Sequence, residues 1–332
     1  MMGISIKDQF TGCTATQSGT GCEQNPGLSS SQECVTWRAS AFMIALFAVL
    51  IVSPHLALAD DPPVPPGKDP GGVAVALVDT GVNYTLPEIS NRLARSPDGE
   101  ILGFDFQDND RLPFDLEPGA GAAAPRRHGT LVASILIREA PHIRLIPYRF
   151  AAKRFETFAE IVNAIASGPA RIVAMPLGGY RRQDWLAFRE AAKAHPELLF
   201  ILSAGNDGRN IDERPVYPAS FEIENALIVT STNSFGRLPP ESNWGTKHVD
   251  VSTPGERIKA LDHDGIRTRV SGSSFAVPRI AALAARLKAR NPKYNALQLK
   301  EAMLENTAPS PASRIPVTKY GWLPNPALIA AD

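Results

Sequence analysis

Three short segments of this chain hold the residue types that acyl-transfer chemistry requires. An aspartate, a histidine and a serine each stand close to a glycine, in residues 78–81, 127–130 and 272–278. A serine hydroxyl is a weak nucleophile at neutral pH, so it needs an imidazole to take its proton and a carboxylate to fix the imidazole tautomer. The residues that fit these three roles are Asp79, His128 and Ser274. The sequence therefore favours a site built around an activated hydroxyl.

The elements expected around these residues alternate between strands and helices. A continuous apolar run predicts a buried strand at 73–78, and apolar or strand-like segments predict further strands at 143–149, 171–177, 198–202 and 226–230, with a weaker candidate at 248–252. Apolar residues at helical spacing predict helices at 130–138, 155–166, 184–194, 274–289 and 295–305. This alternation predicts an α/β fold of three layers, in which a mostly parallel central sheet has helices on both faces. In such sheets the working groups gather beyond the carboxyl ends of the strands, where Asp79 and Asn206 are expected.

Composition excludes several classes of function. The 332 residues include 34 Lys and Arg and 34 Asp and Glu, so no strong charge attracts nucleic acid or an anionic membrane, and no nucleic-acid partner is expected. No G-x-G-x-x-G pattern follows the first strand, which disfavours a nicotinamide-dependent dehydrogenase. All three cysteines, Cys13, Cys22 and Cys34, precede the predicted strands, so the folded body is expected to rely on its apolar core without disulfides.

The N-terminal part divides into three segments. Residues 1–34 are polar and aperiodic, and we interpret them as a disordered extension or as a stretch upstream of the true start, which we place at or near Val35. Residues 35–59 combine a positive start, an apolar run and a small-x-small ending, which predicts a signal peptide cleaved after Ala59. The run is about 12 residues long, short of the roughly 20 that span a bilayer, so no stable membrane span is expected after cleavage. An uncleaved anchor and a buried helix are the alternatives. Residues 60–72 are proline-rich and are expected to form an extended linker.

Four motifs together resemble those of the subtilisin-like serine peptidases, or subtilases. They are Asp-Thr-Gly at 79–81, His-Gly-Thr at 128–130, Ser-Ala-Gly-Asn at 203–206 and Gly-Ser-Ser-Phe-Ala-Val-Pro at 272–278, and their order is that of the family. Each motif alone has a simpler interpretation as a turn or a helix cap. If these simpler interpretations held, the presence of all four motifs in the family's order would require four independent coincidences. The resemblance runs from about residue 73 to residue 308.

The resemblance implies that residues 73–332 form a catalytic domain that cleaves proteins or peptides through an acyl-enzyme. Ser274 would be the nucleophile, His128 the general base and then acid, and Asp79 the residue that orients His128. The side-chain amide of Asn206 and the backbone N–H of Ser274 would form the oxyanion hole. By the same resemblance, the substrate would bind against two segments whose small residues admit a large apolar side chain. These residues are Leu177, Gly178, Gly179, Ser203, Ala204 and Gly205.

The chain also departs from the family's pattern. Pro176 stands where the family usually has a serine, and it removes a backbone donor from the expected substrate-binding strand. The short connection between 138 and 143 leaves no room for a calcium loop that many subtilases carry there. No cofactor is therefore expected to be required, and calcium is allowed but not predicted. Four carboxylates ahead of His128 are expected in a solvated loop: Asp105, Asp108, Asp110 and Asp115.

The sequence thus predicts an exported serine endopeptidase, periplasmic or secreted, that acts as a monomer on a protein or peptide substrate. Two alternatives share its fold. One is a catalytically weak pseudopeptidase that binds peptides, with a site distorted by Pro176 and by the missing loops. The other is an acyl transferase that passes the acyl group to an amine instead of to water.

Overall fold

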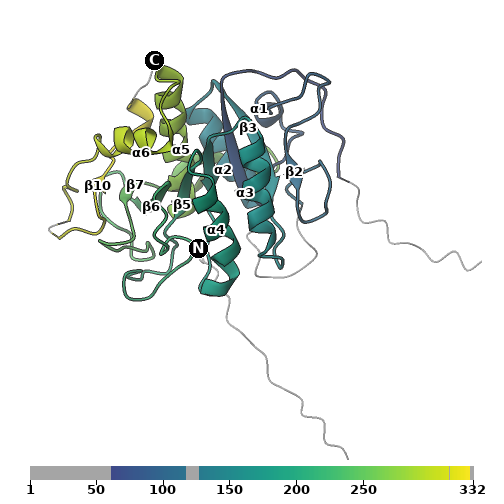
Figure 1. Ribbon diagram of the computed structural model, residues 1–332. Coiled ribbons are helices and arrows are strands. Elements are labelled where there is room, and N and C mark those ends of the chain that lie inside the picture. The colour runs from purple at the N-terminus through teal and green to yellow at the C-terminus, as the bar shows by residue number, and fades with distance from the viewer. Residues whose placement is uncertain (1–60, 117–126, 314, 330–332) are drawn as a thin grey trace, which may run out of the picture. The chain divides into compact units, whose positions relative to one another are not determined.

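A parallel sheet of eight strands runs through the centre of the molecule (Figure 1), whose computed structural model describes residues 61–116, 127–313 and 315–329. The strand order is β10-β7-β6-β5-β4-β1-β3-β2, and every neighbouring pair is parallel. The predicted segments 1–34 and 35–59 lie outside the described residues. The strands are β1 (Val73–Asp79), β2 (Phe104–Asp105), β3 (Ile143–Arg149), β4 (Ile172–Met175), β5 (Leu199–Ser203), β6 (Ala226–Thr232), β7 (Val251–Pro254) and β10 (Gly321–Trp322).

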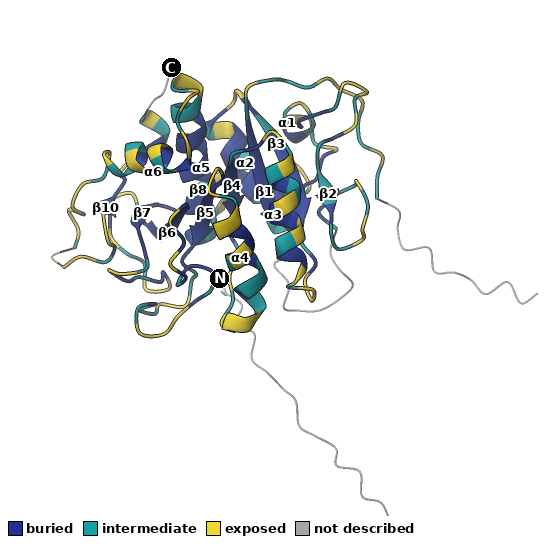
Figure 2. Ribbon diagram, in the orientation of Figure 1, coloured by how far each residue is buried: buried dark blue, intermediate teal, exposed yellow. Residues whose placement is uncertain are grey.

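Helices cover both faces of the sheet, which confirms the predicted three-layer α/β fold. Val75 and Leu77 of β1 belong to a core shared with α2 and α5, whereas Ala76 and Val78 belong to a second core shared with α3 and α4. Alternate side chains of one strand thus fill opposite cores. Figure 2 shows the buried sheet between helices whose outer faces are exposed. The helices are α1 (Pro87–Ser90), α2 (His128–Glu139), α3 (Thr157–Ser167), α4 (Leu186–Ala194), α5 (Ser273–Arg290) and α6 (Ala296–Leu304), with 3₁₀ turns η1 (Arg182–Trp185) and η2 (Pro326–Leu328).

The structure adds an antiparallel hairpin that the sequence did not predict. Its strands are β8 (Ile258–Leu261) and β9 (Arg267–Val270). A lysine interrupts β8, and β9 contains two arginines and a threonine, so neither strand forms a continuous apolar run. The weak strand candidate at 248–252 is displaced toward the C-terminus, to Val251–Pro254. Among the described helices, none has the length and apolar character needed to cross a membrane.

The described part of the proline-rich segment, residues 61–72, has no helix or strand and is held against the domain. The hydroxyl of Tyr84 donates to the carbonyl of Pro62 at 2.8 Å. The guanidinium of Arg95 donates to the carbonyl of Pro65 at 2.8 Å. These bonds satisfy two carbonyls of a segment that, being rich in proline, has few N–H groups for a sheet.

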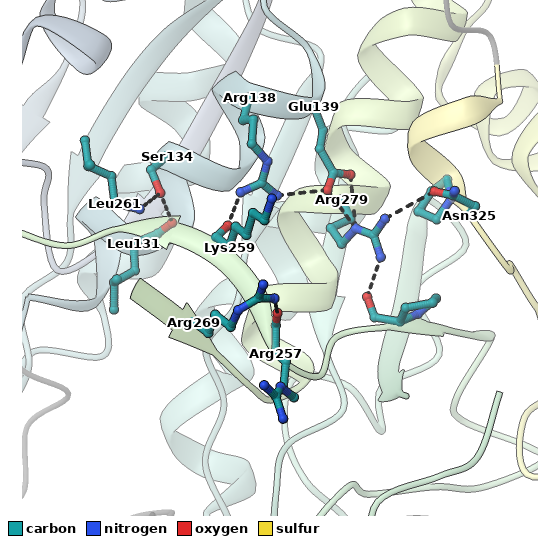
Figure 3. A network of polar contacts seen from close by, with 12 residues as sticks. Leu131, Ser134, Arg138, Glu139, Arg257, Lys259, Leu261, Arg269, Arg279 and Asn325 are labelled. Atoms are coloured by element: carbon teal, nitrogen blue, oxygen red, sulfur yellow. Dashed lines mark hydrogen bonds and ion pairs between the residues drawn. The ribbon is translucent and has the colours of Figure 1, made fainter. Parts of the chain in front are cut away.

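A buried ion pair joins α2 to α5 (Figure 3). Arg279 Nε lies 2.8 Å from Glu139 Oε1, and both side chains are less than 10% exposed, at 9% and 8%. The same guanidinium donates to the carbonyl of Pro254 at 2.7 Å, at the end of β7. The pair therefore links two helices and the sheet through one buried group.

The edge of β8 is covered by α2. Ser134 of α2 accepts a hydrogen bond from the N–H of Leu261 at 2.8 Å, and Arg138 donates to the carbonyl of Lys259 (Figure 3). An uncovered strand edge would present unpaired backbone groups. The hairpin that leads into α5 is thus fixed to α2. Helix α2 begins at His128, and α5 begins at Ser273, next to Ser274.

Candidate active site

Close backbone contact sets the position of His128 at the start of α2. A Cβ on Gly129 would lie 2.0 Å from the carbonyl oxygen of Gly81 and 3.1 Å from Asp79 Cβ, so only glycine fits. The N–H of Gly129 donates to Thr80 Oγ1 at 2.9 Å. The turn after β1 and the first turn of α2 are therefore in direct contact, which brings Asp79 and His128 together.

Asp79 and His128 form a hydrogen-bonded pair. His128 Nδ1 lies 2.9 Å from both carboxylate oxygens of Asp79, which is buried at the end of β1. Burial by itself lowers the pKa of His128, but the charge of Asp79, its hydrogen bond and the charge of Asp115 raise the pKa more, so the net shift is upward. The contact occupies Nδ1 and leaves Nε2 as the nitrogen available for proton transfer.

Asp115 is a buried group of this site that sequence reasoning placed in a solvated loop. Its Oδ2 accepts from the N–H and the hydroxyl of Thr130 at 2.9 and 2.5 Å, and its Oδ1 accepts from the hydroxyl of Thr80 at 2.6 Å. Burial raises the pKa of Asp115 to about 6, although these hydrogen bonds act to lower it. The expectation of a solvated loop is wrong for Asp115 and for Asp105, which are both fully buried.

Asn206 and Ser274 lie beside one another through the residue that precedes Ser274. Asn206 Oδ1 accepts from the backbone N–H of Ser273 at 2.8 Å and from its hydroxyl at 3.0 Å. Because an N–H must bond to an oxygen, this contact fixes which end of the amide is Oδ1 and leaves Nδ2 to donate elsewhere. Gly272 has φ +140°, and a Cβ there would lie 3.2 Å from the same oxygen. The helix therefore starts against the Asn206 side chain.

Phe275, the residue after Ser274, brings the start of α5 to His128. The ring of Phe275 packs against His128 with centroids 5.3 Å apart, which places the start of α5 at the imidazole. Ser274 Oγ donates to the carbonyl of Pro176 at 3.4 Å, and the contacts of the described residues include no bond from it to His128. Such contacts are often long before substrate binds.

The residues expected to bind substrate differ in exposure. Gly178 is exposed and Leu177 and Gly179 are partly buried, whereas Ser203 and Ala204 are buried. Gly205 is partly buried. The N–H and carbonyl of Gly179 both pair with Tyr217, at 2.7 and 2.8 Å, and Ser203 Oγ pairs with Ser273 Oγ at 2.6 Å. Gly178 thus presents the backbone groups that remain accessible on this segment.

A cluster of carboxylates lies on another part of the domain. Carboxylate oxygens of Asp61, Asp105 and Asp108 come within 4.8 Å of one another. Arg149 Nη1 lies 2.8 Å from Asp105 and 2.5 Å from Asp108, so a guanidinium already supplies positive charge there. We therefore assign no metal to this cluster, and the expectation that no cofactor is required stays a prediction.

Comparison with known proteins identifies the family. The subtilase family profile matches residues 71–322, and the chain belongs to that family. A thermophilic serine proteinase from Bacillus sp. (strain AK1) is 30% identical over 268 residues, which are 76% of this chain and 61% of that protein. Thermitase from Thermoactinomyces vulgaris is 28% identical over 247 residues, which are 71% of this chain and 81% of that protein.

The fold has close counterparts among solved structures. A cold adapted subtilisin-like serine proteinase superposes with a TM-score of 0.63 and 26% identity, covering 78% of this chain and 90% of that one. The A-subunit of an AB5 toxin from E. coli shares the fold with a TM-score of 0.64 at 21% identity, covering 79% and 93% of the two chains. The chain spans only 61%, 42% and 25% of three of the curated relatives it matches.

Proposed function

We propose that this protein is an exported serine endopeptidase that cleaves peptide bonds through an acyl-enzyme. The observation that carries the proposal is the pairing of His128 Nδ1 with Asp79, 2.9 Å away, at the start of a helix that lies against the helix bearing Ser274. The curated relatives named above are serine proteases, which supports the same reaction.

The substrate would add a strand to the segment after β4. In an extended chain, the N–H and C=O groups of one residue point to one edge of the strand, and those of the next residue point to the other edge. Gly179 points toward Tyr217, so Gly178 and Pro176 point the opposite way, toward Ser274. The Pro176 carbonyl would accept a hydrogen bond from the N–H of the substrate residue before the cleaved bond. Gly178 would pair with a substrate residue that lies further from the cleaved bond. Binding would also displace Ser274 Oγ from that carbonyl.

This register accounts for Pro176. Its missing N–H would have bonded the carbonyl of the substrate residue opposite it. That carbonyl belongs to the bond to be cleaved, and the oxyanion hole receives it instead. The proline therefore removes no hydrogen bond that the reaction uses, which argues against a site distorted into a pure binder.

The chemical steps follow from these positions. Ser274 Oγ attacks the carbonyl carbon while its proton passes to His128 Nε2, and the C=O electron pair moves to the oxygen. The Ser274 N–H and Asn206 Nδ2 donate to that oxyanion. Its collapse breaks the C–N bond, and the leaving amine takes the proton from His128. Water then attacks the ester and gives its proton to His128, and His128 passes this proton to Ser274 Oγ as the acid departs.

A serine-directed fluorophosphonate probe tests the proposal. We expect labelling of the wild-type protein that is abolished in Ser274→Ala and reduced in Asn206→Ala, together with cleavage of casein by the wild-type protein. Absence of labelling would contradict the proposal and favour the peptide-binding alternative. Labelling without hydrolysis, but with acyl transfer to an added amine, would favour the transferase.

Export is a separate part of the proposal. It rests on the signal-like segment 35–59, with cleavage after Ala59. N-terminal sequencing of the protein recovered outside the cytoplasm tests it. A mature chain that begins at Asp60 is expected, and one that begins at Met1 or Met2 would contradict it.

A further inference from the structure

Two neighbouring strands separate beside the site and are rejoined by side chains. The ladder between β4 and β5 ends at the pair Met175 and Leu202. The hydroxyl of Tyr180 then donates to Asp207 Oδ1 at 2.6 Å, and these residues are 27 positions apart, which is the same offset as in the ladder. Residues 176–179 and 203–206 therefore lie between two cross-links, the end of the β4–β5 ladder and the Tyr180–Asp207 bond.

The closure is reinforced by an arginine. The guanidinium carbon of Arg209 lies 4.6 Å from the centroid of the Tyr180 ring, a cation–π contact. Arg209 Nε lies 3.8 Å from Asp207 Oδ2. Asp207 thus already has a phenol and a guanidinium as partners, so it offers little free negative charge to a basic substrate side chain.

The loop that carries this closure is anchored in the protein interior. Asn243 is fully buried, and its Oδ1 accepts from the N–H groups of Asp207 and Arg209 at 2.9 and 3.0 Å. Its Nδ2 donates to the carbonyl of Ala204 at 2.8 Å. A buried, fully bonded amide holds the loop in one conformation. The contacts of Asp207 and Arg209 therefore rest on a rigid backbone.

A second observation concerns the room beside Gly178. Val216 is buried, and its Cγ1 lies 3.4 Å from the position that a Cβ on Gly178 would take. The valine therefore packs directly beneath the Gly178 backbone, on the side of the segment that faces Tyr217. An isopropyl group therefore lies against Gly178, and the Tyr180 side chain stands at the end of the same segment.

We propose that Tyr180, Asp207 and Arg209, called here the pocket clasp, limit the protein to substrates with a small side chain before the cleaved bond. This inference rests on the proposed function. Alanine fits between the two segments, whereas phenylalanine meets the clasp, and lysine meets the positive charge of Arg209. This proposal differs from the expectation from sequence, in which a large apolar group would enter.

Matched peptide substrates with alanine, phenylalanine or lysine before the cleaved bond test the proposal. The wild-type kcat/KM for the alanine peptide is expected to exceed that for the phenylalanine peptide by about tenfold or more, since a pocket rejects excess side-chain volume by such factors. Tyr180→Ala is expected to reduce that ratio by about tenfold. Tyr180→Phe keeps the ring and is expected to change the ratio less. Tyr320→Ala removes a tyrosine of similar exposure next to β10 and should leave the ratio unchanged.

Peptidyl diphenylphosphonates with alanine-like and phenylalanine-like side chains give a second readout that needs no turnover. Their rates of labelling Ser274 should show the same preference and the same loss of it in Tyr180→Ala. Equal rates for both probes in the wild-type protein, or an unchanged ratio in Tyr180→Ala, would overturn the pocket clasp while leaving the proposed function intact. Failure of Ser274 to react with any probe would overturn both.

Discussion

Glu139 and Arg279 form a buried ion pair between the two helices that carry His128 and Ser274. Glu139 is the last residue of α2, and Arg279 lies in α5 five residues after Ser274. The pair has no direct contact with the reacting groups. It fixes one helix against the other, and catalysis by groups on separate helices depends on that fixed arrangement.

Removal of one partner of this pair should destabilise the fold strongly. Glu139→Ala leaves the Arg279 guanidinium buried without its counter-charge, and we expect a loss of about 3–5 kcal/mol in the free energy of unfolding. Urea unfolding measures it. Arg111→Ala breaks an exposed pair with Glu100, whose side chains are 67% and 66% exposed, and should change stability by about 1 kcal/mol or less. Equal effects of the two substitutions would contradict this role.

The activity should fall on the acid side at a pH set by the raised pKa of His128. The general base works as the neutral imidazole, so kcat/KM is lost as pH falls through its pKa, which lies above the ordinary value of 6.5. Asp115→Asn removes one charge that raises this pKa. The substitution should therefore move the acid limb of the plot of kcat/KM against pH to lower pH. Asp98→Asn, at an exposed carboxylate, should leave the limb in place. A limb that does not move in Asp115→Asn would show that Asp115 has no influence on His128.

Asp115 should also make stability depend on pH. Its folded-state pKa is raised from 3.8 to about 6, so the protonated form is favoured by folding. The stability from this group is complete below pH 3.8 and is lost as pH rises through about 6. Asparagine does not ionise, so the stability of Asp115→Asn relative to wild type should improve across that range. Unfolding in urea at several pH values measures the difference, and a difference independent of pH would refute the assignment.

The Asn206 amide should act on the transition state and little on substrate binding. Asn206→Ala is expected to lower kcat by about 10²–10³ with a small change in KM; the measured example of this magnitude is itself a subtilisin. Steady-state kinetics on a peptide substrate provide the check. Asn163→Ala, at an exposed asparagine of α3, is the control and should leave kcat unchanged. A rise in KM alone would assign Asn206 to ground-state binding.

Pro176→Ser restores the backbone donor that the family usually has. Because the substrate carbonyl at that register goes to the oxyanion hole, we expect kcat/KM to change by less than about tenfold, the upper range of one net hydrogen bond. A much larger gain would mean that Pro176 impairs the site, as the pseudopeptidase alternative requires.

The sequence by itself predicted the six longer strands of the sheet and the helices α2 to α6, and it singled out four motif residues. Apolar runs such as 73–78 and 198–202 are continuous, and each is followed by a polar, glycine-containing segment, so local pattern alone identifies them. Asp79, His128, Asn206 and Ser274 follow from motif and order in the same way. None of these inferences requires knowledge of which segments touch.

The tertiary structure decided what depends on partners far away in the chain. In the sequence, Asp115 is indistinguishable from an exposed carboxylate of a polar loop. Only the folded structure places it in hydrogen-bonding contact with Thr80 and Thr130. Glu139 and Arg279 are separated by 140 residues, and neither carries a local signal that it is buried. Tyr180 meets Asp207 only because β4 and β5 are adjacent and in a given register. Burial and pairing are properties of the packed chain, so they become visible only when the segments are brought together.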